Sequence, residues 1–177
     1  MTLTDLLVCV AVSGLLLSAT FMVLQQGQGA YAVGVARVDA QQSVRLAMER
    51  MAIEIRGAGS SPAAAAFSAI ALAEPTRIVL QHDVDGNGVI AGPGETITYL
   101  LQDTTLRRDA GGGAQPVVNN VRQLRFTYRD ARRNETTEPD LVRSVEVRLS
   151  AGPGHSLRPR GPEVLAHAMT EVRLRNR

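Results

Sequence analysis

The sequence contains no lysine and no tryptophan, and its 177 residues include one cysteine and only 3% aromatic residues. The single cysteine, Cys9, excludes an intramolecular disulfide. So few aromatic residues exclude a core built on large rings, and we expect a thin core of Val, Leu, Ile and Ala. The chain is nevertheless 45% hydrophobic and 20% charged, a globular composition that predicts one domain with an additional element.

Charge is also absent from a long N-terminal segment, because the first charged residue after Asp5 is Arg37. Within it, Leu6 to Leu24 is almost entirely apolar and would span roughly 28 Å as a helix, which matches the hydrocarbon core of a membrane. A cleaved secretory signal would carry basic residues before a shorter apolar core. Nothing basic precedes Leu6, so we predict a membrane-spanning helix.

Proline is missing between Gln25 and Gly57, where apolar residues recur at steps of three and four. That spacing predicts that the helix continues with one apolar stripe. We expect a helix over about residues 2–56, in which residues 1–30 form the transmembrane and assembly half. The remaining helix, 31–56, would pack on a β-sheet region at 63–177, so that residues 31–177 form a water-soluble domain. The stripe consists of Val44, Ala47, Met48, Met51 and Ile55.

The region after Pro62 alternates short β-prone runs with turn signals, which predicts an antiparallel sheet and therefore an α+β fold. Strict alternation in residues 122–128 and 142–149 indicates one apolar face and one wet face. Segments 110–115, 129–140 and 151–162 are rich in Gly, Pro or charge and are expected to be loops. The expected strands are residues 67–73, 77–82, 96–102, 105–108, 121–129, 141–150 and 164–175.

Asp5 needs an explanation, because a carboxylate at the edge of an apolar segment is costly unless it is capped or paired. Thr2 and Asp5 have the spacing of a capping box, in which the helix dipole also favours the anion. Alternatively, Asp5 pairs with a cation of another subunit when such helices bundle. The two roles are compatible.

The loop from Asp83 to Glu95 resembles the first half of a calcium-binding loop. Asp83, Asp85 and Asn87 occupy positions one, three and five, and oxygen ligands at such spacing converge on a hard cation. Glu95 would complete the set with a backbone carbonyl near Val89, although it stands at position thirteen rather than twelve. A turn rich in Asp, Asn and Gly without metal is the alternative.

No catalytic constellation is evident in the sequence. His82, His155 and His167 lack the spacing of a zinc triad or of a Ser/His/Asp set. The glycine runs at 92–94 and 111–113 lack the Lys and Ser/Thr of a phosphate loop. We therefore expect a protein that is not an enzyme.

The N-terminal sequence MTLTDLLVCVAVSGLLL resembles the mature N-terminus of type IV pilins and pseudopilins. That family begins with Phe or Met, then Thr-Leu, a Glu at the fifth position and a long apolar helix. The calcium-like loop and the strands that follow it also resemble PilW-like minor pilins and GspJ-type pseudopilins. The segments that carry this second resemblance are residues 83–99, 106–107, 120–128 and 172–176.

The resemblance implies a type IV pilin-like fold and a structural subunit that assembles through its N-terminal helix. Asp5 would attract the N-methylated amine of Met1 of a neighbouring subunit, although Asp replaces the usual Glu. Where a leader precedes Met1, a prepilin peptidase would cleave before it; if Met1 is a translation start, Asp5 keeps only the capping role. The resemblance therefore implies a minor subunit that initiates a type IV pilus or a type II secretion pseudopilus, or that lies at its tip.

The same resemblance implies a single-pass protein of the bacterial inner membrane, with a periplasmic C-terminal domain before assembly. Its expected partners are other pilins or pseudopilins, membrane lipid and an inner-membrane assembly platform. Two alternatives stay open. One is a tip pilin that binds DNA or a surface, since residues 122–177 hold twelve Arg against seven acidic residues. The other is a single-pass membrane protein with a calcium-stabilised β-domain that never polymerises.

Overall fold

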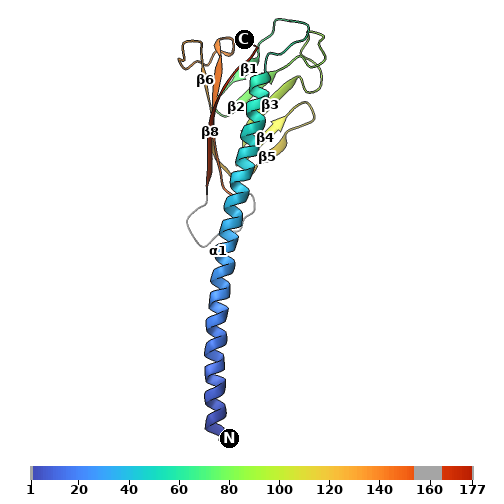
Figure 1. The fold of residues 1–177 in the computed structure, drawn as a ribbon. Coiled ribbons are helices and arrows are strands. Elements are labelled where there is room, and N and C mark those ends of the chain that lie inside the picture. Colours follow the sequence, from blue (N-terminus) through green and yellow to red (C-terminus); the bar gives the residue numbers. More distant parts are fainter. Residues whose placement is uncertain (1, 154–164, 177) are drawn as a thin grey trace.

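The computed structural model describes residues 2–153 and 165–176. One helix, α1 (Leu3–Gly57), extends far beyond a compact β-rich domain, and its N-terminus marks the opposite end of the molecule from the C-terminus (Figure 1). This is the predicted α+β arrangement, consistent with a pilin-like layout. The strands are β1 (Ile70–Ala73), β2 (Arg77–Gln81), β3 (Thr96–Gln102), β4 (Thr105–Asp109), β5 (Gln115–Val118), β6 (Val121–Arg129), β7 (Ser144–Ala151) and β8 (Ala166–Arg173).

The ends of α1 lie within one residue of the predicted ones. Thr2 is the N-cap, and the helix ends at Gly57 with Ala58 as its C-cap. Gly59 then turns the chain with φ of +78°, a conformation that favours glycine. A Cβ at Gly59 would also lie 2.9 Å from the Ala69 Cβ, so this turn has no room for a side chain.

The strands form two antiparallel sheets rather than the single sheet expected from the sequence. One has the order β1-β2-β3-β4-β5 and the other β6-β7-β8. Backbone hydrogen bonds of 2.8 Å join them, from Phe126 N to the Pro75 carbonyl and from Val121 N to the Thr104 carbonyl. The edge of β6 is thus tied to turns of the first sheet.

Individual strands differ from the prediction. The strand expected at 67–73 begins only at Ile70. The sequence analysis missed β5, which contains Pro116 at an edge of its sheet, the position where proline is tolerated. The predicted strand at 141–150 begins only at Ser144, because Pro139–Leu141 forms a 3-10 turn. The face of β7 that was expected to be wet buries Glu146, because Arg129 and Arg148 hold its carboxylate at 3.1 and 2.6 Å.

The core lies between the second half of α1 and the inner faces of both sheets. The buried face of the helix includes all five residues of the predicted stripe and Ala40. It packs mainly against β8 and β7 and also against β5. Most of the buried residues are Val, Leu, Ile and Ala, as the composition predicted, and they include Val118, Val145, Val147, Leu149 and Val172. The core also buries three aromatic residues, Tyr99, Phe126 and Tyr128.

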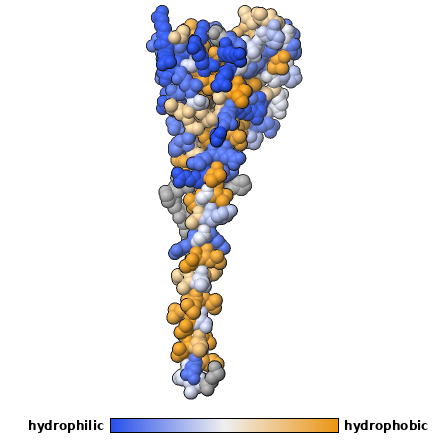
Figure 2. All heavy atoms as spheres, in the orientation of Figure 1, coloured by the Kyte–Doolittle hydropathy of each residue, from blue (hydrophilic) through white to orange (hydrophobic). Residues whose placement is uncertain are grey.

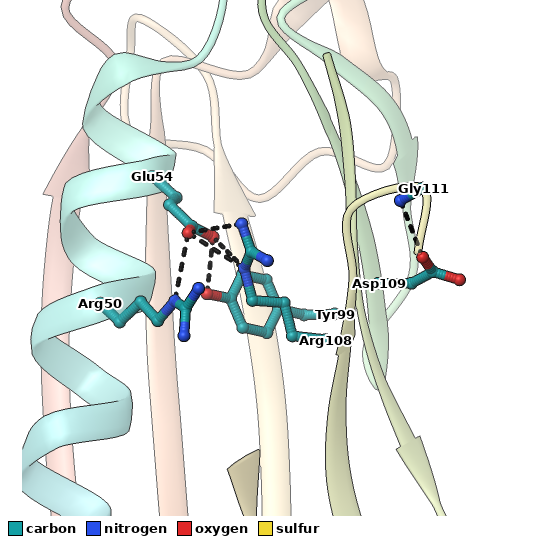
Figure 3. Close-up of polar contacts among 6 residues, drawn as sticks. All are labelled: Arg50, Glu54, Tyr99, Arg108, Asp109 and Gly111. Atoms are coloured by element: carbon teal, nitrogen blue, oxygen red, sulfur yellow. Dashed lines mark hydrogen bonds and ion pairs between the residues drawn. The ribbon is translucent and has the colours of Figure 1, made fainter. Parts of the chain in front are cut away.

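A polar cluster fastens the helix to the five-stranded sheet (Figure 3). The Glu54 carboxylate accepts a 2.6 Å hydrogen bond from the Tyr99 hydroxyl and pairs with Arg108 at 2.9 Å. Arg50, one turn earlier on the helix, donates to the same carboxylate at 3.3 Å. Burial disfavours the Glu54 carboxylate, but the hydrogen bonds from Arg108, Tyr99 and Arg50 outweigh it and hold its pKa below the usual range.

We expect Glu54→Gln to lower the free energy of unfolding of the full chain in detergent micelles by about 2 kcal/mol, because three donors lose a charged acceptor. Since the pKa of Glu54 is lowered on folding, its contribution is present above the ordinary value of 4.5 and is lost as the pH falls through the folded value. The difference between wild type and variant should therefore shrink below about pH 4.

Glu49→Gln is the matched control, because Glu49 pairs with Arg45 on the same helix with side chains 55% and 80% exposed. Its loss should be below about 0.5 kcal/mol. Chemical denaturation at several pH values measures both variants. Equal losses for the two would show that the cluster does not fasten the helix.

Candidate functional site

The first half of α1 is a free surface. Every described residue from Thr2 to Ala30 is exposed, and the apolar side chains form a sleeve around the helix (Figure 2). This helix is long and apolar enough to cross a membrane, which fits a single-pass membrane protein. Two polar side chains within the sleeve are satisfied internally. Ser18 donates to the Gly14 carbonyl at 2.8 Å and Thr20 to the Leu16 carbonyl at 3.0 Å.

The capping role predicted for Asp5 is confirmed. Its Oδ2 accepts a 2.9 Å hydrogen bond from Thr2 N, and its own N–H donates to the Thr2 hydroxyl at 3.4 Å. Of the described residues, none donates to Oδ1, which keeps that oxygen available to a cation. Met1, the predicted site of processing and methylation, lies outside the described residues.

A second apolar stripe, which sequence analysis missed, runs along the outer side of the domain half of the helix. We call it the outer stripe: Tyr31, Val35, Val38, Leu46 and Ile53. At 3.6 residues per turn these positions lie within roughly a quarter of the circumference, opposite the buried face. The last three are 61%, 57% and 66% exposed. The spacing of 31, 35 and 38 and the seven-residue step from 46 to 53 are the signal that would have revealed it.

The loop between β2 and β3 is organised around two buried carboxylates. Glu95 accepts hydrogen bonds from four backbone N–H groups, including those of Val84 at 3.1 Å and Gly92 at 2.6 Å. Asp83 accepts from Gly86 N at 2.9 Å, Gly88 N at 3.2 Å and the Ser61 hydroxyl. The hydrogen bond from Gly92 N chiefly lowers the pKa of Glu95, and that from Ser61 lowers the pKa of Asp83.

Three of the five predicted calcium ligands come together in this loop. Asp83, Asp85 and Glu95 each present an oxygen within 4.8 Å of the others. The Asn87 amide is used within the loop, because its nitrogen donates to Asp85 Oδ2 at 2.7 Å and its oxygen accepts from Val89 N at 2.7 Å. The Val89 carbonyl accepts from Ala91 N at 3.2 Å. The carboxylates have the chemistry of a calcium site, whereas Asn87 would have to turn its oxygen to join them.

The histidines do not form a common site in the described part of the chain. His82 follows β2, and burial lowers the pKa of its imidazole. His167 is exposed on β8 of the other sheet, and His155 lies outside the described residues. The Arg-rich region is of mixed charge where β6 pairs with β7, because Arg129 and Arg148 both hold Glu146.

Comparison with known proteins adds no family assignment. No protein-family model matches the chain, and no curated protein is significantly similar to it. The resemblance to type IV pilins stays a prediction that rests on the N-terminal residues and on the order of the later segments.

We expect about 1 mM calcium to raise the melting temperature of the full chain in detergent micelles by several degrees, because a ligand that binds only the folded state stabilises it. Asp85→Asn should abolish this rise and leave the melting temperature in chelator nearly unchanged. The reason is that Asp85 is exposed and, among the described residues, accepts hydrogen bonds from Asn87 alone. Equal melting temperatures of wild type in calcium and in chelator would leave the loop as a turn without metal.

Proposed function

We propose that this chain is a structural minor subunit of a type IV pilus or of a type II secretion pseudopilus, with no catalytic role. It would be held in the bacterial inner membrane by α1, with its β-domain in the periplasm, and would then enter the filament through the same helix. Its partners would be other pilins or pseudopilins and the inner-membrane assembly platform. Before assembly, membrane lipid would surround the first half of α1. A prepilin peptidase would process it where a leader precedes Met1.

One observation carries this proposal: the exposed apolar surface of α1 is longer than a membrane is thick. An anchor needs apolar surface only over a span such as Leu6 to Leu24. Beyond this span, the outer stripe adds exposed apolar side chains over roughly 33 Å on the side of the helix that faces away from the domain, interspersed with polar residues such as Gln42 and Glu49. Burying a large apolar side chain contributes about 1.5–3 kcal/mol, so several of them favour contact with another protein surface.

Small residues in the first half fit helix packing inside a bundle. Ala11, Gly14 and Ser18 are three and four residues apart and therefore share one side of the helix. Ser18 satisfies its hydroxyl on the Gly14 carbonyl, so this side presents little polarity to a neighbour. Small residues on one side allow membrane helices to approach closely, and we expect a sister helix to pack there.

Ile53→Gln and Val38→Gln should each reduce incorporation into filaments about tenfold, because they remove apolar contacts that form only on assembly. Both side chains are exposed in the single chain, so membrane insertion and domain stability should stay unchanged. The measurement is the fraction of the protein recovered in sheared filaments, or crosslinked to other pilin-like subunits, relative to the membrane fraction.

Met169→Gln is the matched control, because Met169 is 65% exposed on β8 and lies outside the outer stripe. It should assemble like the wild type. Normal incorporation of Ile53→Gln and Val38→Gln, or an equal loss in Met169→Gln, would contradict assembly through the outer stripe.

For Asp5 we expect Asp5→Ala to insert in the membrane and to lose about tenfold in incorporation, because a charged partner is left unpaired. Thr2→Ala separates the two roles of Asp5: it removes the N-cap hydroxyl and keeps the carboxylate. We expect Thr2→Ala to assemble normally in the same assay. A loss as large as that of Asp5→Ala would reduce Asp5 to its capping role.

A further inference from the structure

A charged hollow of about 390 Å³ lies at the end of the domain farthest from the helix N-terminus. Its lining residues come from the β6–β7 loop, the start of β7 and the end of β8. Figure 1 shows these segments at the end of the domain away from the helix N-terminus. Three arginines line it: Arg133 and Arg143 from the β6–β7 loop, and Arg173 from the end of β8. Asp130 and Glu171 also line the hollow.

Both carboxylates of this hollow already accept hydrogen bonds from neutral groups. Asp130 Oδ1 accepts from the backbone N–H groups of Arg132 at 2.8 Å and Asn134 at 2.9 Å. Glu171 Oε1 accepts from the Ser144 hydroxyl at 2.7 Å. The Asp130 carboxylate therefore stabilises the β6–β7 loop, and the Glu171 carboxylate links β8 to the start of β7.

The arginines keep unused donors. Within residues 2–153 and 165–176, the side chains of Arg133 and Arg173 make no hydrogen bond or ion pair with another described residue. Arg143 uses Nη1 on the backbone carbonyls of Asp140 and Val142, at 3.3 and 3.1 Å. A guanidinium has five N–H donors, so Nε and Nη2 of Arg143 also stay available.

The loop holds Arg133 in place rather than leaving it in a flexible chain. Its φ of +66° lies in the left-handed region, which costs a residue other than glycine about 1 kcal/mol. Backbone hydrogen bonds from Arg133 N to the Asp130 carbonyl at 3.1 Å and from Asp130 N to the Asn134 carbonyl at 2.9 Å stabilise the turn.

We propose that this hollow, lined by Arg133, Arg143 and Arg173, binds the carboxylate of an acidic segment of another protein. Guanidinium groups bind carboxylates through paired, charge-assisted hydrogen bonds. A hollow of about 390 Å³ is at the small end of ligand pockets and has room for one or two acidic residues.

An extended nucleic acid fits this place less well. Binding to a phosphate backbone draws on many contacts, and proteins that bind it strongly neutralise about six to ten phosphates. The neighbouring Arg129 and Arg148 both bind Glu146, so the charge of these two arginines is already balanced within the sheet.

The test measures binding of a fluorescent, amidated hexaglutamate peptide to the full chain in detergent micelles, by anisotropy at about 50 mM salt. We expect saturable binding that weakens about tenfold in Arg133→Gln and in Arg173→Gln. Both side chains are exposed and make no contact that the fold needs, so the variants should melt like the wild type.

Arg125→Gln is the matched control, because it removes one exposed arginine from β6, outside the hollow. It should change the affinity less than twofold, and a thymidine oligonucleotide should compete less well than unlabelled peptide. No saturable binding at about 1 mM peptide would overturn the proposal. An equal loss in Arg125→Gln, or tighter binding of the oligonucleotide that the same variants abolish, would also overturn it. The assay uses single subunits, so its failure leaves the assembly proposal untouched.

Discussion

The whole structure depends on one helix, α1, whose first half is exposed and apolar and whose second half forms part of the domain core. In a membrane every backbone polar group must be satisfied within the segment, which requires an uninterrupted helix. The same 55-residue element supplies the inner wall of the domain, where Val44, Met51 and Ile55 are buried against both sheets. Both backbone hydrogen bonds between the two sheets in the described part of the chain come from β6, and α1 packs against strands of both sheets. The same helix therefore serves as the anchor and as part of the core. The contacts of Glu54 with Tyr99 of β3 and Arg108 of β4 fix the position of the helix against that sheet.

That continuity has a mechanical consequence for assembly. A domain rigidly joined to its helix moves with it, so any contact that orients α1 in a filament also orients the β-domain. The outer stripe lies on the domain half of the helix, opposite its buried face, where a neighbour can reach it without displacing either sheet. An anchor joined by a flexible linker would transmit no such orientation.

Local signals made α1 predictable, because the apolar pattern, Thr2 and Asp5 at one end and Gly57 at the other all lie within or beside it. Alternation likewise predicted β6, and short-range spacing brought Asp83, Asp85 and Glu95 into one loop. The division into two sheets was not predictable, since alternation assigns faces but not partners. Glu54 and Glu146 look like solvated residues in the sequence because a partner that buries each of them is distant: Tyr99 lies 45 residues from Glu54, and Arg129 lies 17 residues from Glu146. The outer stripe was missed although its signal is local, because a single apolar face already explained the helix.

The two ends of the molecule differ in the kind of partner they can hold. From Leu6 to Leu24 the helix is exposed, mostly apolar and without charge, and Figure 2 shows hydrophobic residues along the face in view. Such a surface favours neighbours that exclude water, such as lipid or another apolar helix. At the far end, loops present fixed charges: carboxylates held by backbone N–H groups between β2 and β3, and arginines beside a turn that Asp130 stabilises. Charges that the backbone orients can discriminate between partners, whereas an apolar sleeve accepts any similar helix. Since a helix of 55 residues is roughly 80 Å long, in the proposed filament the distal end would meet a partner far from the place where the apolar first half of α1 packs.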